Sequence, residues 1–255
     1  MRNLAAIPRT LLTLLSGVVA TIVLGTAAIA VGHFRPTSPI VQRIIELWSK
    51  AWLAPAGVRL EIEGSENVDP NESYVVVANH LSNMDVMVCF TAVPVPIRYL
   101  AKKELFSVPL LAQAMRAVGM VEVDRQHRGT ATIESVNRQS RHVIERGHSL
   151  IIYPEGTRSR SGEPQPFKKG AFTMAAAAGM PLLPLTIHGT REVWAPASPW
   201  IHPGTVRVVI DPPVPTADAT KTEVAELRAR MEGQIHGRYR ALQVTVRDGH
   251  GSAGT

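Results

Sequence analysis

The 255-residue sequence has a single cysteine, Cys89, so the chain cannot form an internal disulfide. Cys89 lies in an apolar run, residues 86–90, where a buried thiol is more usual than a nucleophile. The nine histidines show no HExxH pattern and no paired Cys/His spacing, which argues against a zinc site. The sequence also lacks Gly-x-Ser-x-Gly, the elbow that presents a nucleophilic serine.

Acidic residues are outnumbered by basic ones, and the formal net charge of +6 indicates an anionic partner. Nucleic acid is the first alternative. Aromatic and basic residues do not alternate as in an RNA-binding sheet, however, and no recognition-helix motif is present. A phosphate-bearing membrane lipid explains the same charge, so we expect a lipid partner and no nucleic acid.

The segment from Leu11 to Val31 contains no charged residue, and as a helix it is long enough to cross a hydrocarbon core of about 30 Å. Two interpretations remain open. The segment is either an uncleaved membrane anchor or a signal peptide cleaved near Ala30, with Arg2 and Arg9 as its basic leader. Its apolar length exceeds that of a usual signal peptide, which favours the anchor.

A second helix is predicted from Ile40 to Trp52, because apolar residues recur there at helical spacing opposite polar ones. Its tryptophans, Trp48 and Trp52, suit the level of lipid headgroups in a membrane. Packing of the same face on the protein's own core is an equal alternative.

Beyond Leu53 the chain alternates short apolar strands with helices. Strands are predicted at 118–123 and 150–153, with an amphipathic helix between them that Gly147 can end, and a helix of that length joins parallel strands. Further strands are expected at 74–78, 182–187 and 206–210, and further helices at 108–118, 172–178 and 224–239. We therefore predict an α/β fold: a single domain with a largely parallel central sheet flanked by helices, preceded by an N-terminal membrane-binding helical segment.

The segment Asn79–Asp85 places an imidazole and a carboxylate five residues apart, directly after an apolar strand. On one helix His80 and Asp85 would point about 140° apart, so they meet only if the chain turns between them. Ser82 or Asn83 can cap a helix whose first turn contains Asp85. His80 would then take a proton from an alcohol while Asp85 fixes its tautomer. A turn histidine beside a helix-capping aspartate is the structural alternative.

Three further segments follow in order: Gly119–Arg125, Tyr153–Arg158 and Leu182–Ile187. Together with Asn79–Asp85, they resemble the four ordered motifs of the glycerolipid acyltransferases, the family of 1-acylglycerol-3-phosphate acyltransferases. The resemblance runs from about Val58 to Ile210. It implies that His80 and Asp85 are catalytic and that the basic residues beside the motifs hold a phosphate. The implied substrate-binding residues are Asn79, Lys102, Arg125, Glu155, Gly156, Thr157 and Arg158.

The side chains of these segments fit a phosphate site. Gly156 lets the backbone approach a ligand closely, and Thr157 and Arg158 can donate hydrogen bonds. Lys103 can share the role of its neighbour Lys102. The segment Phe167–Gly170 is similarly placed, and either ligand contact or the protein surface explains its two lysines.

The resemblance implies transfer of an acyl chain from an acyl thioester, acyl-CoA or acyl carrier protein, to the free hydroxyl of lysophosphatidic acid. The product would be phosphatidic acid, made for phospholipid biosynthesis without a metal or other cofactor. Transfer would be direct, because Ser82, the nearby hydroxyl, is expected to act as a helix cap. Two alternatives remain: another lysophospholipid or a lyso-aminolipid as the acceptor, or a non-catalytic scaffold that binds anionic lipid.

Cytosolic acyl thioesters require the catalytic domain to face the cytoplasm, so we expect association with the cell inner membrane. The expected organisation is a membrane anchor and amphipathic helix at residues 1–55, the catalytic domain at 56–243, and a disordered polar tail at 244–255.

Overall fold

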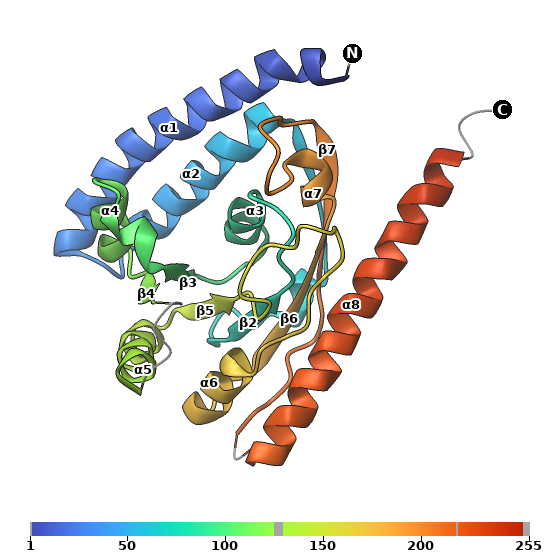
Figure 1. Cartoon of the computed structure of the whole chain (residues 1–255). Coiled ribbons are helices and arrows are strands. Elements are labelled where there is room, and N and C mark those ends of the chain that lie inside the picture. Colours follow the sequence, from blue (N-terminus) through green and yellow to red (C-terminus); the bar gives the residue numbers. More distant parts are fainter. Residues whose placement is uncertain (1, 125–129, 218, 252–255) are drawn as a thin grey trace.

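A computed structural model describes the backbone of residues 2–124, 130–217 and 219–251, and the side chains of residues 3–124, 134–217 and 219–244 (Figure 1). Its seven-stranded sheet has the order β1-β7-β6-β2-β5-β3-β4. The strands are β1 (Val58–Glu63), β2 (Val75–Ala78), β3 (Ile97–Lys102), β4 (Val121–Val123), β5 (Ser149–Ile152), β6 (Leu182–His188) and β7 (Gly204–Ile210).

Neighbouring strands pair in parallel, except that β6 and β7 are antiparallel. The predicted α/β fold with a largely parallel sheet is therefore confirmed. The central strand β2 consists of four buried residues, Val75 to Ala78, as expected of a parallel strand covered on both faces.

The helices are α1 (Arg2–Phe34), α2 (Pro39–Ala56), α3 (Asp85–Ala92), α4 (Leu111–Ala117), α5 (Thr130–Glu145), α6 (Gly170–Ala178), α7 (Thr190–Val193) and α8 (Lys221–Gly251), with 3-10 helices η1 (Ser65–Asn67) and η2 (Lys103–Ser107). Helices α2 and α3 cover one face of the sheet, and α6 and α8 cover the other (Figure 1). Alternate residues of β2 face the two cores: Val76 and Ala78 pack with α2 and α3, and Val75 and Val77 with α6 and α8.

The apolar N-terminal helix α1 lies side by side with α2 (Figure 1). A side chain at Gly17 would force the ring of Trp52 to move, because its Cβ would lie 2.2 Å from that ring. Trp48 Nε1 donates a hydrogen bond of 2.9 Å to Thr21 Oγ1. The opposite face of α1 exposes a row of large apolar side chains: Leu4, Leu11, Leu12, Leu15, Val18, Val19, Ile22 and Val23. The helix is long and apolar enough to cross a membrane.

The predicted second helix is α2, and its apolar face packs on the protein's own core, which is one of the two interpretations of its sequence. Val41, Ile44 and Ile45 of α2 are buried in the core between α2 and the sheet. Trp48 and Trp52 are half-buried against the same core. The apolar spacing of α2 thus reflects its position between α1 and the sheet.

Some predicted boundaries were wrong, for local reasons. The helix predicted at 108–118 begins only at Leu111, because Leu110 adopts a left-handed φ of 64°. The strand predicted at 118–123 begins at Val121, after Gly119 turns the chain with φ 84°.

At the C-terminus, α8 continues to Gly251, so residues 244–251 of the tail expected to be disordered are helical. Extending an existing helix by a further residue costs little once the helix has formed. Residues 252–255 of that tail lie outside the described residues.

Candidate active site

Two of the motif segments and the predicted phosphate ligand Lys102 meet at one edge of the sheet. His80 follows β2, the Tyr153–Arg158 segment follows β5, and Lys102 ends β3. Because β5 pairs in parallel with both β2 and β3, the carboxyl ends of these strands lie together. Such an edge is where open α/β sheets bind their ligands.

His80 and Asp85 are in direct contact across the turn that the sequence predicts. His80 Nδ1 lies 2.7 Å from Asp85 Oδ2, which also accepts hydrogen bonds of 2.8 Å from the backbone N–H groups of Leu81 and Ser82. Asp85 is fully buried in the first turn of α3, where the helix dipole favours a carboxylate. Since a carboxylate only accepts, His80 Nδ1 carries the proton and Nε2 is the basic nitrogen. The His80 side chain is 14% exposed, so this nitrogen can meet a substrate.

The loop after β5 is bonded to the backbone of His80 on both sides. Glu155 Oε1 accepts a hydrogen bond of 2.7 Å from His80 N, and Ser159 N donates one of 2.9 Å to His80 O. The second carboxyl oxygen, Glu155 Oε2, accepts from Gln165 N at 2.9 Å. Burial raises the pKa of Glu155 to about 7. Glu155 is 2% exposed and both of its oxygens bond to backbone groups, so its contact with His80 is a positioning one.

Asn79 is also a positioning residue. Its Nδ2 donates to Ile187 O and its Oδ1 accepts from Ile187 N, both at 2.8 Å, and the side chain is fully buried. The two bonds fix the end of β2 to β6. The sequence suggested a substrate contact for Asn79, but its amide atoms are occupied within the protein.

The aromatic ring of Tyr153 forms one wall of the site, a feature that the sequence interpretation missed. It stacks on the His80 ring, with ring centroids 3.9 Å apart and planes 6° apart. Its hydroxyl lies 3.1 Å from that of Tyr99, which donates to Val86 O. The sequence did offer a signal for this role, because Tyr153 stands directly before Pro-Glu-Gly-Thr-Arg at the end of a predicted strand.

The thiol of Cys89 lies 3.6 Å from the Tyr153 hydroxyl. Burial raises the pKa of Cys89 to about 12 and that of Tyr153 well above its usual value. Both groups are therefore neutral near pH 7. Cys89 has the character of a core thiol and not of a nucleophile.

Ser82 is fully buried and its hydroxyl is occupied. Ser82 Oγ donates a hydrogen bond of 2.7 Å to Trp194 O and accepts one of 3.0 Å from Met84 N. The sequence predicted a helix cap at Ser82 or Asn83, whereas the N-cap residue of α3 is Met84. The structural role of Ser82 thus lies in the turn that leads into the helix.

The basic side chains are distributed along the same edge. Lys102 Nζ pairs with Glu104 at 2.9 Å, and Lys103 Nζ pairs with Asp124 at 3.2 Å. Thr157 and Arg158 are exposed beyond Gly156, whose φ of 79° favours glycine. The predicted phosphate ligand Arg125 lies outside the described residues.

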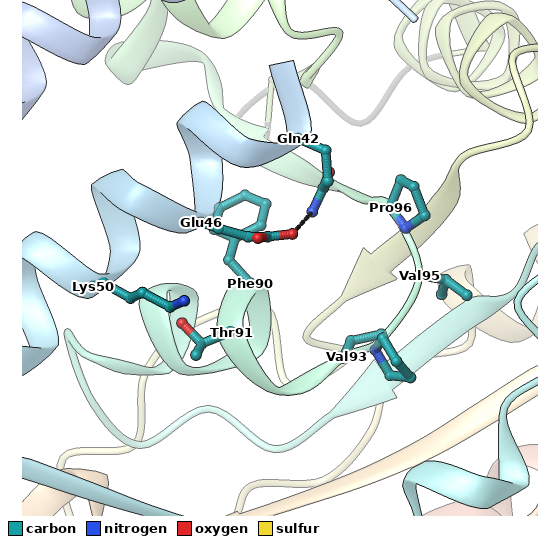
Figure 2. A pocket seen from close by; sticks show the side chains of 9 residues that line it. Gln42, Glu46, Lys50, Phe90, Thr91, Val93, Val95 and Pro96 are labelled. Carbon is teal, nitrogen blue, oxygen red and sulfur yellow. Dashed lines mark hydrogen bonds between the residues drawn. The ribbon is translucent and has the colours of Figure 1, made fainter. Parts of the chain in front are cut away.

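A separate cavity of about 270 Å³ lies between α2 and the connection from α3 to β3. Figure 2 shows Gln42 and Glu46 of α2 on its wall, joined by a hydrogen bond, with Phe90 of α3 beside them. None of its lining residues belongs to the His80 site, although Phe90 contacts Tyr99 with ring centroids 4.9 Å apart. Within the described residues, no cluster of three His, Cys, Asp or Glu side chains is arranged to hold a metal ion.

A family model described as Acyltransferase matches residues 59–188, which include His80, Asp85 and the Glu155–Arg158 turn. The chain is 33% identical to 1-acyl-sn-glycerol-3-phosphate acyltransferase from Limnanthes douglasii, over 66% of this chain and 59% of that protein. It is 28% identical to the protein of the same name from Pseudomonas aeruginosa, over 89% of this chain and 88% of that protein.

The human 1-acyl-sn-glycerol-3-phosphate acyltransferase alpha is 28% identical, over 76% of this chain and 68% of that protein. Among solved structures, the 1-acyl-sn-glycerophosphate (LPA) acyltransferase PlsC from Thermotoga maritima is similar with a TM-score of 0.81 and 27% identity. That likeness covers 95% of this chain and 98% of the other, so the two folds correspond over nearly their whole length.

Proposed function

This chain belongs to the acyltransferase family, and we propose that it transfers an acyl chain to the free hydroxyl of lysophosphatidic acid, giving phosphatidic acid. The observation that carries the proposal is the 2.7 Å contact between His80 and the buried Asp85, beside the Gly156–Arg158 turn. Similarity to proteins named as 1-acyl-sn-glycerol-3-phosphate acyltransferases supports lysophosphatidic acid as the acceptor.

In this mechanism, His80 Nε2 takes the proton of the acceptor hydroxyl while the oxygen attacks the thioester carbonyl. The new C–O bond forms as the C–S bond breaks, and the imidazolium passes its proton to the departing sulfur. Asp85 stabilises the imidazolium and holds the ring in one tautomer. No acyl-enzyme is required, in keeping with the occupied hydroxyl of Ser82.

The phosphate of the acceptor would bind among Lys102, Arg125, Thr157 and Arg158. A guanidinium can bond to two phosphate oxygens at once, and a lysine supplies a compact charge. The acyl donor would be acyl-CoA or acyl carrier protein, acting as a co-substrate with no resident cofactor.

We also propose that residues 1–55 form the membrane-binding segment of a catalytic domain at 56–243. The apolar outer face of α1 would lie in the cell inner membrane, with the catalytic domain on its cytoplasmic side. Two contacts support an uncleaved α1: Ser16 Oγ donates to Ala51 O at 2.8 Å, and Thr10 Oγ1 accepts from Ile201 N at 2.9 Å. Cleavage near Ala30 would remove both and uncover α2.

The test is to give the purified, lipid-reconstituted protein lysophosphatidic acid with acyl-CoA or with acyl carrier protein, and to identify products by mass spectrometry. Other lysophospholipids and lyso-aminolipids form parallel arms. We expect phosphatidic acid from the wild type and a loss of product with His80→Ala. The matched control is His142→Ala, which removes an exposed histidine of α5. Product from a different acceptor alone would reject lysophosphatidic acid, and no product from any arm would reject the enzyme.

A further inference from the structure

The ammonium group of Lys168 lies directly over Gly156 in the turn that follows β5. A Cβ at position 156 would be 2.3 Å from Lys168 Nζ, which is closer than real contacts allow. Gly156 also has a φ of 79°, which other residues rarely adopt. The space that a side chain at 156 would occupy is thus filled by a positive charge from another part of the chain.

The backbone around Lys168 is fixed, although its side chain is exposed. Lys168 N donates to Pro154 O at 3.0 Å, which attaches it to the turn itself. The preceding residue, Phe167, is buried, and its N and O atoms bond to Glu232 and Arg228 of α8 at 2.9 and 3.1 Å. These contacts set where the Lys168 side chain leaves the backbone.

The ion pairs of the described residues include none to Lys168 or Arg158. The carboxylate of the turn, Glu155, directs its oxygens to the backbone amides of His80 and Gln165. Both cations are exposed, Lys168 over Gly156 and Arg158 two residues further along the loop that bonds to the backbone of His80.

We propose that Lys168 binds a phosphate group of a substrate, together with Arg158. The inference rests on the proposed function and adds a residue to it. The acceptor carries a phosphate, and so does the phosphopantetheine arm of acyl-CoA and of acyl carrier protein. The ammonium group of Lys168 supplies a positive charge for the phosphate, and its backbone is held in place. Its position over Gly156 puts that charge beside a backbone that a phosphate can approach closely.

Lys169 provides a matched control, because it is exposed, carries the same charge and lies next in the chain. The three heavy atoms nearest to a Cβ at position 156 all belong to Lys168, and none belongs to Lys169. Steady-state rates would be measured for Lys168→Met, Lys168→Arg and Lys169→Met, varying acceptor and donor separately. We expect Lys168→Met to raise the KM for one substrate roughly tenfold, as for a lost charge-assisted hydrogen bond, with Lys168→Arg recovering most of it. Lys169→Met should stay within about twofold of wild type.

The substrate whose KM rises identifies the source of the phosphate: lysophosphatidic acid in one arm, the acyl thioester in the other. Equal KM values for Lys168→Met and Lys169→Met in both arms would overturn the inference.

A binding measurement separates this inference from the proposed function. Inorganic phosphate should raise the melting temperature of wild type and Lys169→Met more than that of Lys168→Met. That result, with a wild type inactive on lysophosphatidic acid, would keep the Lys168 site and reject the proposed reaction. If the wild type is active on lysophosphatidic acid and Lys168→Met does not change the effect of phosphate on the melting temperature, the proposed reaction stands and the Lys168 site is rejected.

Discussion

The imidazole ring of His80 stacks face to face on the phenol ring of Tyr153, with centroids 3.9 Å apart and planes 6° apart. Two further contacts restrain the same residue: Asp85 at Nδ1 and Glu155 at the backbone N–H. His80 is therefore held on a ring face, at a ring edge and along its backbone. The basic nitrogen, Nε2, is the part left for a substrate, and each restraint can be removed separately.

Removing the proposed general base or its partner should abolish most activity in a folded protein. His80→Ala and Asp85→Asn should each lower kcat by about 10² to 10⁴, the usual range for general acid–base groups. Turnover would be measured beside circular dichroism and membrane fractionation. Near-normal turnover of His80→Ala would mean that another group takes the proton.

Ser82→Ala serves as the comparison, because the Ser82 hydroxyl bonds only to backbone groups. We expect a milder loss than for His80→Ala. An acyl group found on Ser82 by mass spectrometry would contradict direct transfer.

Tyr153 should act through the position of His80. Tyr153→Phe keeps the stacked ring and loses the bond to the Tyr99 hydroxyl, so kcat should fall only a few-fold. Tyr153→Leu also loses the stacking and should lower kcat further, by up to roughly tenfold, since aromatic pairs contribute about 0.5–1.5 kcal/mol beyond burial. KM should change little in either variant. If kcat falls as much in Tyr153→Phe as in Tyr153→Leu, the hydroxyl of Tyr153, and not its ring, positions His80.

Arg158 should be sensitive to a change that preserves its charge. Arg158→Lys should raise the KM for the acceptor, because a lysine cannot reproduce the planar two-point contact with phosphate. The apparent affinity for the donor should change less. Arg160→Lys is the matched control, since Arg160 is exposed two residues further on. If the KM of Arg158→Lys for the acceptor equals that of wild type, Arg158 is a surface residue and does not bind the phosphate.

Glu155 should make stability depend on pH. Burial raises its pKa in the folded protein from 4.5 to about 7, so at intermediate pH the folded state binds more protons than the unfolded chain. Its contribution, about 3 kcal/mol from that difference, is present below about pH 4.5 and is lost as the pH rises through 7. The melting temperature of wild type should therefore fall between pH 5 and 8 relative to Glu155→Gln, which does not titrate. Parallel curves would show that Glu155 does not titrate in this range.

The contact between His80 and Asp85 could be predicted because it is local. A strand, a turn and a helix start within eleven residues determine which side chains meet, and the sequence shows each of them. The position of the site segments at the carboxyl ends of parallel strands also follows from the sequence, since a helix between strands makes them parallel.

Contacts between distant parts of the chain could not be derived in this way. Asn79 bonds to Ile187, and Lys168 reaches Gly156, only because the complete sheet brings these segments together. The strands β1 and β3 were not specifically predicted, and neither was the antiparallel pairing of β6 with β7. Each depends on which neighbours a strand acquires, and hydrophobic spacing within one segment carries no such information.

The outer face of α1 should hold the protein on the membrane. Leu15 and Ile22 are exposed on that face, so Leu15→Lys combined with Ile22→Lys should leave the fold intact. Each lysine opposes burial in lipid by up to about 2.5–3.5 kcal/mol, and the double variant should move largely to the soluble fraction. Val244→Lys is the control, because Val244 is an equally exposed apolar residue of α8, on the opposite side of the sheet. Equal release of the Val244 variant would mean that added charge, and not the α1 face, determines the result.

The same membrane fraction tests whether α1 is retained. Intact-mass analysis should find a chain that still contains Leu11 to Val31, because α1 packs along α2 through Gly17 and Trp52 and is part of the folded protein. Deleting residues 1–32 should release much of the protein and expose the apolar surface of α2, so the truncated chain should also melt at a lower temperature. A mature chain that begins near Val31 would establish a cleaved signal peptide. It would place the domain outside the cytosol, away from the acyl thioesters on which the proposed transfer depends.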